Sequence, residues 1–182
     1  MTNWKKHKKD FDSFGIGYID SIPKKHIDYL KHNIDFSKEA NNKLAGYIKE
    51  EYYYKNWPED LQSFIIDSSN HKNLIPYIKN LDMLSKDAPF YLNSMWANRQ
   101  KKYEFNPLHN HTGVLSFIIF LKIPYDLKKE DKVFPKNFDT PSISRLTFIG
   151  NEILGGVYHI QIDVDKSFEN KMLMFPAKLW HM

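Results

Sequence analysis

The chain has 182 residues, 42% of them hydrophobic and 15% aromatic, which fits one folded domain with a sizeable core and argues against disorder. It contains no cysteine, so disulfides, zinc–thiolate sites, iron–sulfur clusters and cysteine nucleophiles are excluded. The net charge of +4 comes mainly from scattered lysines, with Arg99 and Arg145 as the arginines. Because arginine is the favoured reader of bases, this pattern predicts a solvated surface and no nucleic-acid partner.

The longest apolar run covers residues 113–123 and is interrupted by Ser116 and Lys122, so it is too short to span a membrane. The basic residues at the N-terminus are not followed by an apolar segment, and they therefore do not form a secretory signal. From the sequence we expect no membrane association and a cytoplasmic location.

The first half of the chain is expected to be a mainly helical preface over residues 1–88. Residues 1–22 are broken by glycines and are expected to be an irregular lead-in. Apolar side chains then recur at helical spacing, with Ser37 as an N-cap and Pro58 near a first helical position. Helices are predicted over residues 24–31, 38–53, from Pro58 onward and over 71–85.

After Pro89 the pattern changes to short β-branched and aromatic runs separated by turns, which is typical of strands. These runs cover residues 91–100, 114–123, 144–150, 157–164 and 171–175. Several short strands after a helical start predict a single α+β domain, with a barrel or sandwich core over residues 89–182.

Three histidines form a candidate metal site. His109 and His111 stand at positions i and i+2 just before an apolar run, and on an extended strand both imidazoles point to the same face. Two neutral ring nitrogens on one stiff element suit a divalent transition metal. His181 follows the apolar run Lys171–Phe175 and a proline turn. It can supply a third ligand if the core brings the two segments side by side.

Two motifs carry a resemblance to a known family. The first is Trp96-Ala-Asn98-Arg-Gln100 followed by Glu104-Phe-Asn-Pro-Leu-His109-Asn-His111-Thr-Gly113, and the second is Met174-Phe-Pro-Ala-Lys-Leu-Trp-His181. Together they resemble a group of 2-oxoglutarate- and Fe(II)-dependent oxygenases, many of them encoded by marine bacteriophages and bacteria. The resemblance implies a double-stranded β-helix, or jelly-roll, core with helices packed against one sheet. It also implies hydroxylation by O2, with 2-oxoglutarate converted to succinate and CO2.

Carried onto this chain, the resemblance makes His109 the first metal ligand and His181 the distal one. His111 stands where the common motif of the family has Asp or Glu, which departs from the usual set of two histidines and one carboxylate. Either His111 completes a three-histidine face, or it turns away and water or another residue completes the shell. Asn110 is expected to point to the opposite face of the strand.

The resemblance also implies a binding site for the cosubstrate. Members of the family hold the distal carboxylate of 2-oxoglutarate with an arginine or lysine after the distal histidine, but the sequence continues for only one residue after His181. The last core strand is therefore expected to be missing, with Lys122 or Arg145 as the substitute for that basic residue. Asn98, on the strand before His109, is expected to hydrogen-bond 2-oxoglutarate.

Two other classes of function stay open. A cupin-like three-histidine metalloenzyme that does not use 2-oxoglutarate fits the two close histidines, although no glutamate stands between Thr112 and Tyr125. A non-catalytic jelly-roll binding module, or an inactive fragment of an active enzyme, is the other class. The loops carry no recognisable code for a substrate, and both a peptide and a small metabolite stay open as its class. A phage-encoded protein would act in the host cytoplasm.

Overall fold

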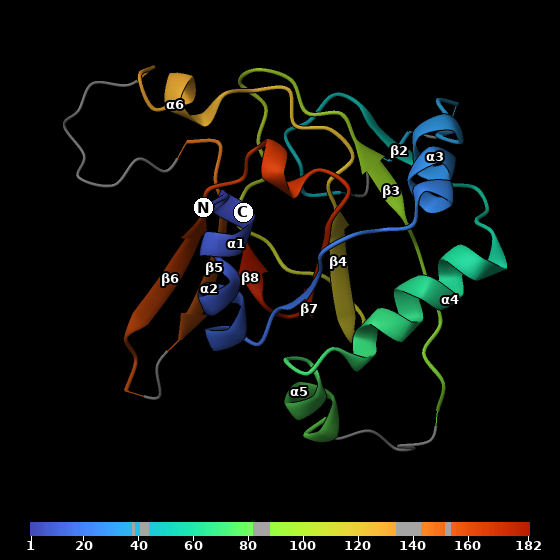
Figure 1. Ribbon diagram of the computed structural model, residues 1–182, viewed down its shortest axis with the longest axis horizontal. Helices are drawn as coiled ribbons and strands as arrows, with labels where there is room; N and C mark the ends of the chain where they lie inside the picture. Colours follow the sequence, from blue (N-terminus) through green and yellow to red (C-terminus); the bar gives the residue numbers. More distant parts are fainter. Residues whose placement is uncertain (38, 41–43, 82–87, 134–142, 152–153) are drawn as a thin grey trace.

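A computed structural model describes residues 1–37, 39–40, 44–81, 88–133, 143–151 and 154–182, and these form a mixed α+β chain with antiparallel sheets (Figure 1). One sheet has the order β1-β7-β4, made of Gly17–Ile19, Met172–Pro176 and Leu115–Ile119. A second has the order β6-β5-β8, made of Val157–Ile162, Leu146–Asn151 and Trp180–His181. A third pairs β2, Glu51–Tyr53, with β3, Trp96–Asn98. The α+β class is confirmed, but the described strands do not close into a barrel.

The helices are short and lie mostly in the first half of the chain. They are α1 Asn3–Lys6, α2 Lys8–Ser13, α3 Lys24–His32, α4 Glu59–Asp67, α5 Ile75–Lys79 and α6 Leu127–Glu130, with 3-10 turns η1 Ser68–Asn70 and η2 Lys166–Phe168. The predictions of α3 and α4 are confirmed, and Pro58 caps the start of α4. Of the helix predicted over 71–85, α5 is the helical part within the described residues, and residues 82–85 lie outside them. None of the described helices is long and apolar enough to cross a membrane.

The prediction of an irregular lead-in over residues 1–22 was wrong. This segment contains α1, α2 and strand β1, which pairs with β7. Trp4 and Phe11 are buried at 2% and 0% exposure, with His7 buried between them at 3%. The spacing i, i+3, i+7 of these three residues places them on one helical face, and that spacing was the signal missed. The glycines follow the helices rather than prevent them, and Gly15 has a φ of +64°.

The helix predicted over residues 38–53 was also wrong in the part that the structure describes; residues 38 and 41–43 lie outside it. Glu39 bridges to Tyr52, Tyr47 bridges to Phe105, and β2 pairs with β3. Three consecutive tyrosines begin at Tyr52, and aromatic residues favour a pleated, half-buried strand. Tertiary pairing with a strand far along the chain therefore outweighed a weak helical periodicity.

Strand β7 is the centre of the molecule because both of its faces are buried. Leu173 and Phe175 point into one apolar core, which lies between the two three-stranded sheets and includes Phe148 of β5 and Trp4 of α1. Met172 and Met174 point into the second core. Side chains alternate between faces along a strand, so a continuous apolar run is required where both faces are covered.

The second core packs helices onto the outer face of the β1-β7-β4 sheet. It contains Ile27 of α3, Leu61 and Ile65 of α4, and Leu74 just before α5, and Figure 1 shows α4 beside β4. Helices therefore cover one face of the β1-β7-β4 sheet. The β6-β5-β8 sheet, whose strand β8 contains His181, covers the other face. The segments that carry His109 and His181 lie where the two three-stranded sheets meet.

Candidate metal centre

Backbone pairing brings the two histidine segments together. The N–H of His109 donates to the carbonyl of His181 and the N–H of His181 donates to the carbonyl of His109, each with an N···O distance of 2.9 Å. The N–H of His111 donates to the carbonyl of Ala177 at 2.8 Å, and the N–H of Ala177 donates to Val114 at 3.0 Å. These bonds tie the turn before β8 to the segment before β4. The register of the two segments is therefore set by main-chain atoms.

Aromatic side chains hold His181 in the core. Its ring lies 4.9 Å from that of Phe175 and 5.9 Å from that of Phe148, between ring centroids, and His181 is 4% exposed. Phe148 is also its partner in the pairing of β5 with β8. Histidine is only intermediate in its tendency to be buried, so the burial of this ring is the first sign of a specific role.

The three imidazoles meet at one point. The ring centroid of His109 lies 4.3 Å from that of His181 and 4.9 Å from that of His111, and the distance between the rings of His111 and His181 is 5.0 Å. One nitrogen of each ring lies within 4.8 Å of one nitrogen of each of the others. The prediction that these three histidines come together is confirmed, and His111 does not turn away from the other two.

Hydrogen bonds set the tautomer of two of the rings. Nδ1 of His109 lies 2.7 Å from the carbonyl oxygen of Pro107, and Nδ1 of His181 lies 2.9 Å from that of Leu179. A carbonyl only accepts, so Nδ1 carries the hydrogen in both rings and, in the neutral ring, Nε2 keeps a free lone pair. Metal-binding histidines are oriented in this way by a second hydrogen bond.

Burial keeps two of the rings neutral. Burial, with a smaller contribution from the charge of nearby His109, lowers the pKa of His111 from 6.5 to about 4. Burial also lowers the pKa of His181 to about 4, against the opposing effect of the hydrogen bond to Leu179. Both rings are therefore unprotonated at neutral pH, which is the form that binds a metal.

A cavity of about 300 Å³ opens beside the group. Its wall includes His109 and His111, and the ring of Trp96 lies 5.6 Å from that of His111. The remaining lining residues are Leu44, Ala45, Tyr53, Ser94, Asn110 and Thr112. Asn110, expected to face away, thus lines the cavity as well, because His109 forms an isolated bridge and not part of an ideal strand. Tyr53 was missed because it was assigned to a helix.

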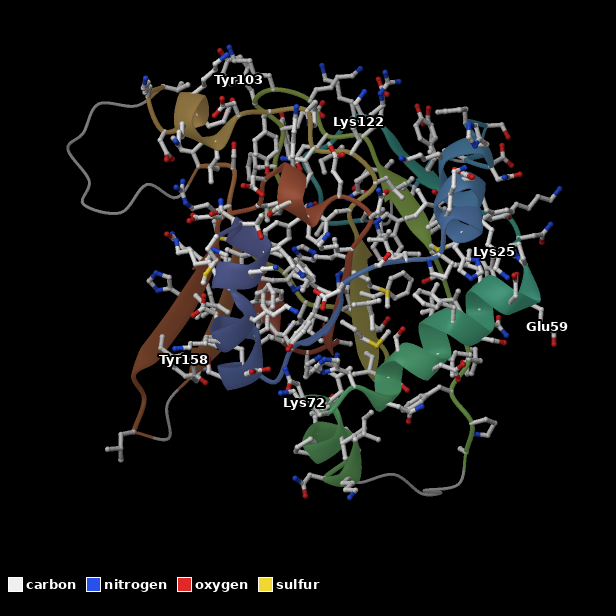
Figure 2. All side chains as sticks on the ribbon, viewed as in Figure 1. Lys25, Glu59, Lys72, Tyr103, Lys122 and Tyr158 are labelled. Carbon is white, nitrogen blue, oxygen red and sulfur yellow. The ribbon has the colours of Figure 1, made fainter. Side chains whose placement is uncertain are left out.

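Of the three predicted cosubstrate residues, one lies on an element that lines the cavity. Asn98 is exposed and follows Trp96 by two residues in β3. Lys122 is exposed beyond the end of β4, at the outside of the molecule (Figure 2). Arg145 is 8% exposed at its side chain and forms ion pairs with Asp131 at 2.7 Å and Asp163 at 2.9 Å. The guanidinium of Arg145 is therefore engaged by carboxylates of the chain itself.

The other histidines have different surroundings. Nδ1 of His7 bonds to Asp10 at 2.7 Å, and its Nε2 accepts from the N–H of Asp163 at 3.0 Å. His159 lies on β6 and is exposed. Within the described part of the chain, no group of three potential ligands other than the one at His109 meets the distance needed for a shared metal.

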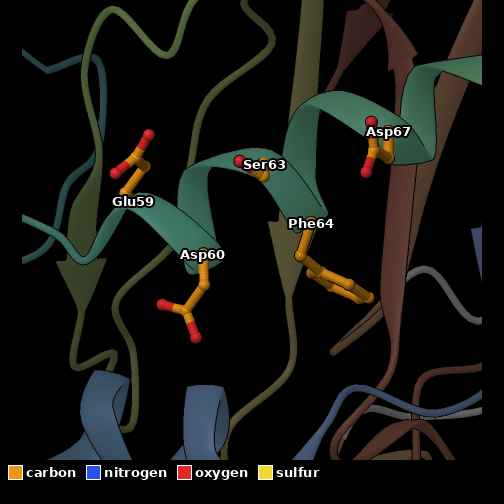
Figure 3. Close-up of a pocket in the computed structure, with 5 residues that line it drawn as sticks. All are labelled: Glu59, Asp60, Ser63, Phe64 and Asp67. Carbon is orange, nitrogen blue, oxygen red and sulfur yellow. The ribbon is translucent and has the colours of Figure 1, made fainter.

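A second hollow follows the outer side of α4. It is lined by Glu59, Asp60, Ser63, Phe64 and Asp67 (Figure 3). Asp60 accepts a hydrogen bond from Lys25, which lowers the pKa of the Asp60 carboxyl. Figure 3 shows the acidic side chains spread along the helix rather than converging on one point. This surface therefore lacks the convergent ligands that the histidine group has.

The three-histidine group can hold a metal ion. Three neutral imidazole nitrogens suit Fe(II), zinc, copper or nickel, whereas Mg²⁺ and Ca²⁺ prefer oxygen ligands. A metal held on one face by three ligands keeps positions open for a small molecule from the cavity side. Comparison of the chain with family models, curated proteins and solved structures finds no match. The geometry of the site is therefore the basis for a functional assignment.

Proposed function

We propose that this protein is an Fe(II)- and 2-oxoglutarate-dependent oxygenase, in which His109, His111 and His181 hold the iron. The observation that carries the proposal is the meeting of three imidazoles at the edge of a cavity of about 300 Å³. The sequence resemblance to such oxygenases supports the same residues independently of the geometry. The two antiparallel three-stranded sheets around one core support a jelly-roll interpretation of the fold.

The ligand set fits iron of this type. Iron sites in such oxygenases use three protein ligands on one face, and the open positions accept a bidentate cosubstrate and O2. Iron with 2-oxoglutarate supplies the oxidising chemistry that the side chains of the chain lack. The three-histidine face differs from the usual one by replacing a carboxylate with neutral His111. The bound metal therefore keeps one more unit of positive charge, which favours an anionic cosubstrate.

The residues of the chain would position the reactants. Trp96 packs near His111 in the wall of the cavity. Tyr53 and Ser94 line the cavity, and their hydroxyl groups would be candidates to hydrogen-bond a carboxylate. Asn98 is the best placed of the predicted cosubstrate residues because β3 also carries Trp96. Arg145 is less suited, since its charge is already offset by Asp131 and Asp163.

A second candidate function is a three-histidine metalloenzyme that does not use 2-oxoglutarate. Two observations favour it: the ligand group contains no carboxylate, and Arg145 is bound within an ion-pair cluster. In this case the metal would activate a water or bind a substrate directly. The two candidates share the metal site and differ only in the molecule bound at the open positions.

Anaerobic titration with Fe(II) and 2-oxoglutarate tests the proposal. The chelate should give its visible charge-transfer band with the wild-type protein and no band with His109→Ala. His159→Ala is the matched control, because His159 is an exposed histidine on β6 outside the ligand group. Metal binding without the band would favour the second candidate. A folded protein that binds no metal would contradict both candidates.

A further inference from the structure

Glu51 carries a buried carboxylate that no other described residue pairs with. It lies in β2 with 1% exposure, and neither of its carboxylate oxygens has a hydrogen-bond partner among the described residues. Removing an ionised carboxylate from water without a partner is strongly unfavourable, so such a group either takes up a proton or binds a cation. The carboxylate of its neighbour Glu50, in contrast, has two partners. It forms one ion pair with Arg99 at 3.2 Å and another with Lys101.

A second acceptor oxygen, Oδ1 of Asn106, lies beside Gly46 together with Oε1 of Glu51. A methyl group placed on Gly46 would lie 2.7 Å from Oε1 of Glu51 and 2.7 Å from Oδ1 of Asn106. Gly46 is not among the described glycines with positive φ, so its backbone would allow other residues. The absence of a side chain at Gly46 leaves room for both oxygens beside its backbone. Two acceptors that converge in this way call for a positive group between them.

The local charge also favours a cation. The carboxylate of Glu104 accepts from the backbone N–H groups of Lys49 at 3.3 Å and Lys101 at 2.8 Å. Burial, with a further contribution from the negative charge of Glu104, raises the pKa of Glu51. The basic side chains nearby are directed at Glu50. The negative charge of Glu104 therefore adds to that of Glu51, and no described basic side chain pairs with Glu51.

We propose that Glu51 and Asn106 form a binding site for a hard divalent cation, specifically Ca²⁺. A proton would satisfy one oxygen of Glu51 and leave the other without a partner, whereas a cation can satisfy both and also the amide oxygen of Asn106. Ca²⁺ accepts carboxylate and amide oxygens in irregular geometry and completes its shell with water. Asn106 is half-buried, so the site opens towards solvent on its side.

This site is separate from the histidine group in its chemistry. Oxygen ligands select hard cations, and imidazoles select transition metals. Asn106 lies three residues before His109, so a bound Ca²⁺ would tie the histidine-bearing loop to β2. The proposal does not depend on the assignment of an oxygenase function, and each can fail without the other.

Terbium luminescence tests the site, because Tb³⁺ replaces Ca²⁺ at oxygen ligands and is excited through nearby tyrosines. Tyr52 and Tyr53 follow Glu51 directly in β2. The wild-type protein should give saturable luminescence that Ca²⁺ displaces. Glu51→Gln should weaken Tb³⁺ binding at least tenfold, and so should Gly46→Ala, which places a methyl group against both oxygens.

Two controls make the result specific. His109→Ala should retain Tb³⁺ binding, and so should Glu59→Gln, an exposed glutamate at the start of α4. Circular dichroism of each variant establishes that it is folded. Luminescence of equal strength in Glu51→Gln would overturn the proposal, as would the lack of any Ca²⁺-displaceable signal in the wild type. The latter result would mean that the amide of Asn106 is turned and donates to Glu51 instead.

Discussion

The histidine group and the ion-pair cluster around Arg145 are both polar assemblies at the edge of the same apolar core, but they differ in how their polar atoms are satisfied. In the cluster, Arg145 pairs with Asp131 and Asp163, and His7 uses both of its ring nitrogens. In the histidine group, His109 and His181 use Nδ1 alone. One nitrogen of each of the three rings lies within 4.8 Å of one nitrogen of each of the others.

The difference separates structural polar residues from residues that can bind a ligand. A polar group whose hydrogen-bonding capacity is filled by the protein stabilises the fold and has little left to offer a ligand. Neutral rings that converge on one point have no attraction for each other, so their arrangement contributes little to stability without a metal. We therefore expect substitutions in the cluster to change stability and substitutions in the histidine group to change metal binding.

The largest expected effect is from Arg145→Met. Loss of the guanidinium leaves Asp131 and Asp163 without their shared partner, although both carboxylates are partly exposed. We expect the free energy of unfolding to fall by about 3 kcal/mol, at the low end for a broken buried pair, with metal affinity unchanged. Urea denaturation and metal titration of the same sample measure both quantities. A stable variant that no longer binds 2-oxoglutarate would instead assign Arg145 to the cosubstrate.

The reverse pattern is expected for His109→Ala. His109 is half-buried and its side chain supplies one of three ligands. Metal affinity should fall by roughly 100-fold or more, since even outer-shell changes cost 10- to 100-fold, while the urea midpoint should move little. A competitive titration against a metal-sensitive dye gives the affinity. Equal affinities of His109→Ala and His159→Ala would refute the ligand assignment.

The stability of the metal-free protein should depend on pH through His111 and His181. The pKa of each is lowered from 6.5 to about 4 in the folded protein, so the unfolded chain binds protons first as the pH falls. Their contribution to stability is fully present above pH 6.5 and is lost progressively between pH 6.5 and about 4. Urea midpoints across this range should fall for the wild type, and the double variant His111→Gln/His181→Gln should reduce the slope.

The smallest effect is expected from Lys6→Ala, in the same cluster as Arg145. The ammonium of Lys6 lies 3.0 Å from Asp163, but its side chain is 59% exposed. Exposed ion pairs contribute less than about 1 kcal/mol, and Asp163 keeps its bond to Arg145. The urea midpoint should therefore change only slightly. A loss as large as that of Arg145→Met would show that the position of α1, and not the burial of the charge, controls this cluster.

Several features of the fold could be predicted from the sequence because they are local. The apolar spacing in α3, the start of α4 after Pro58 and the β-branched run of β4 each depend on neighbours in the chain. The paired histidines His109 and His111 were visible for the same reason. The helical face of α1 and α2 was also present in the sequence but was obscured by the glycines that follow.

Other features were decided by contacts between distant segments. Residues 51–53 became a strand because β3 pairs with them, and a local helical pattern cannot report such a partner. Arg145 had the chemistry of a carboxylate-binding residue, but the fold places Asp131 and Asp163 beside it.

By itself, the sequence determined which residues could bind a metal, because it fixes the identity and the i, i+2 spacing of His109 and His111. It also determined the apolar runs that form the two cores. Only the tertiary structure decided that His181 joins them and that its ring is buried and neutral. It also decided that the carboxylate of Glu51 has no hydrogen-bond partner among the described residues. The physical reason is that burial and long-range strand pairing depend on how the layers of the fold pack together. Burial sets the protonation state of a side chain, and strand pairing sets which groups it can contact.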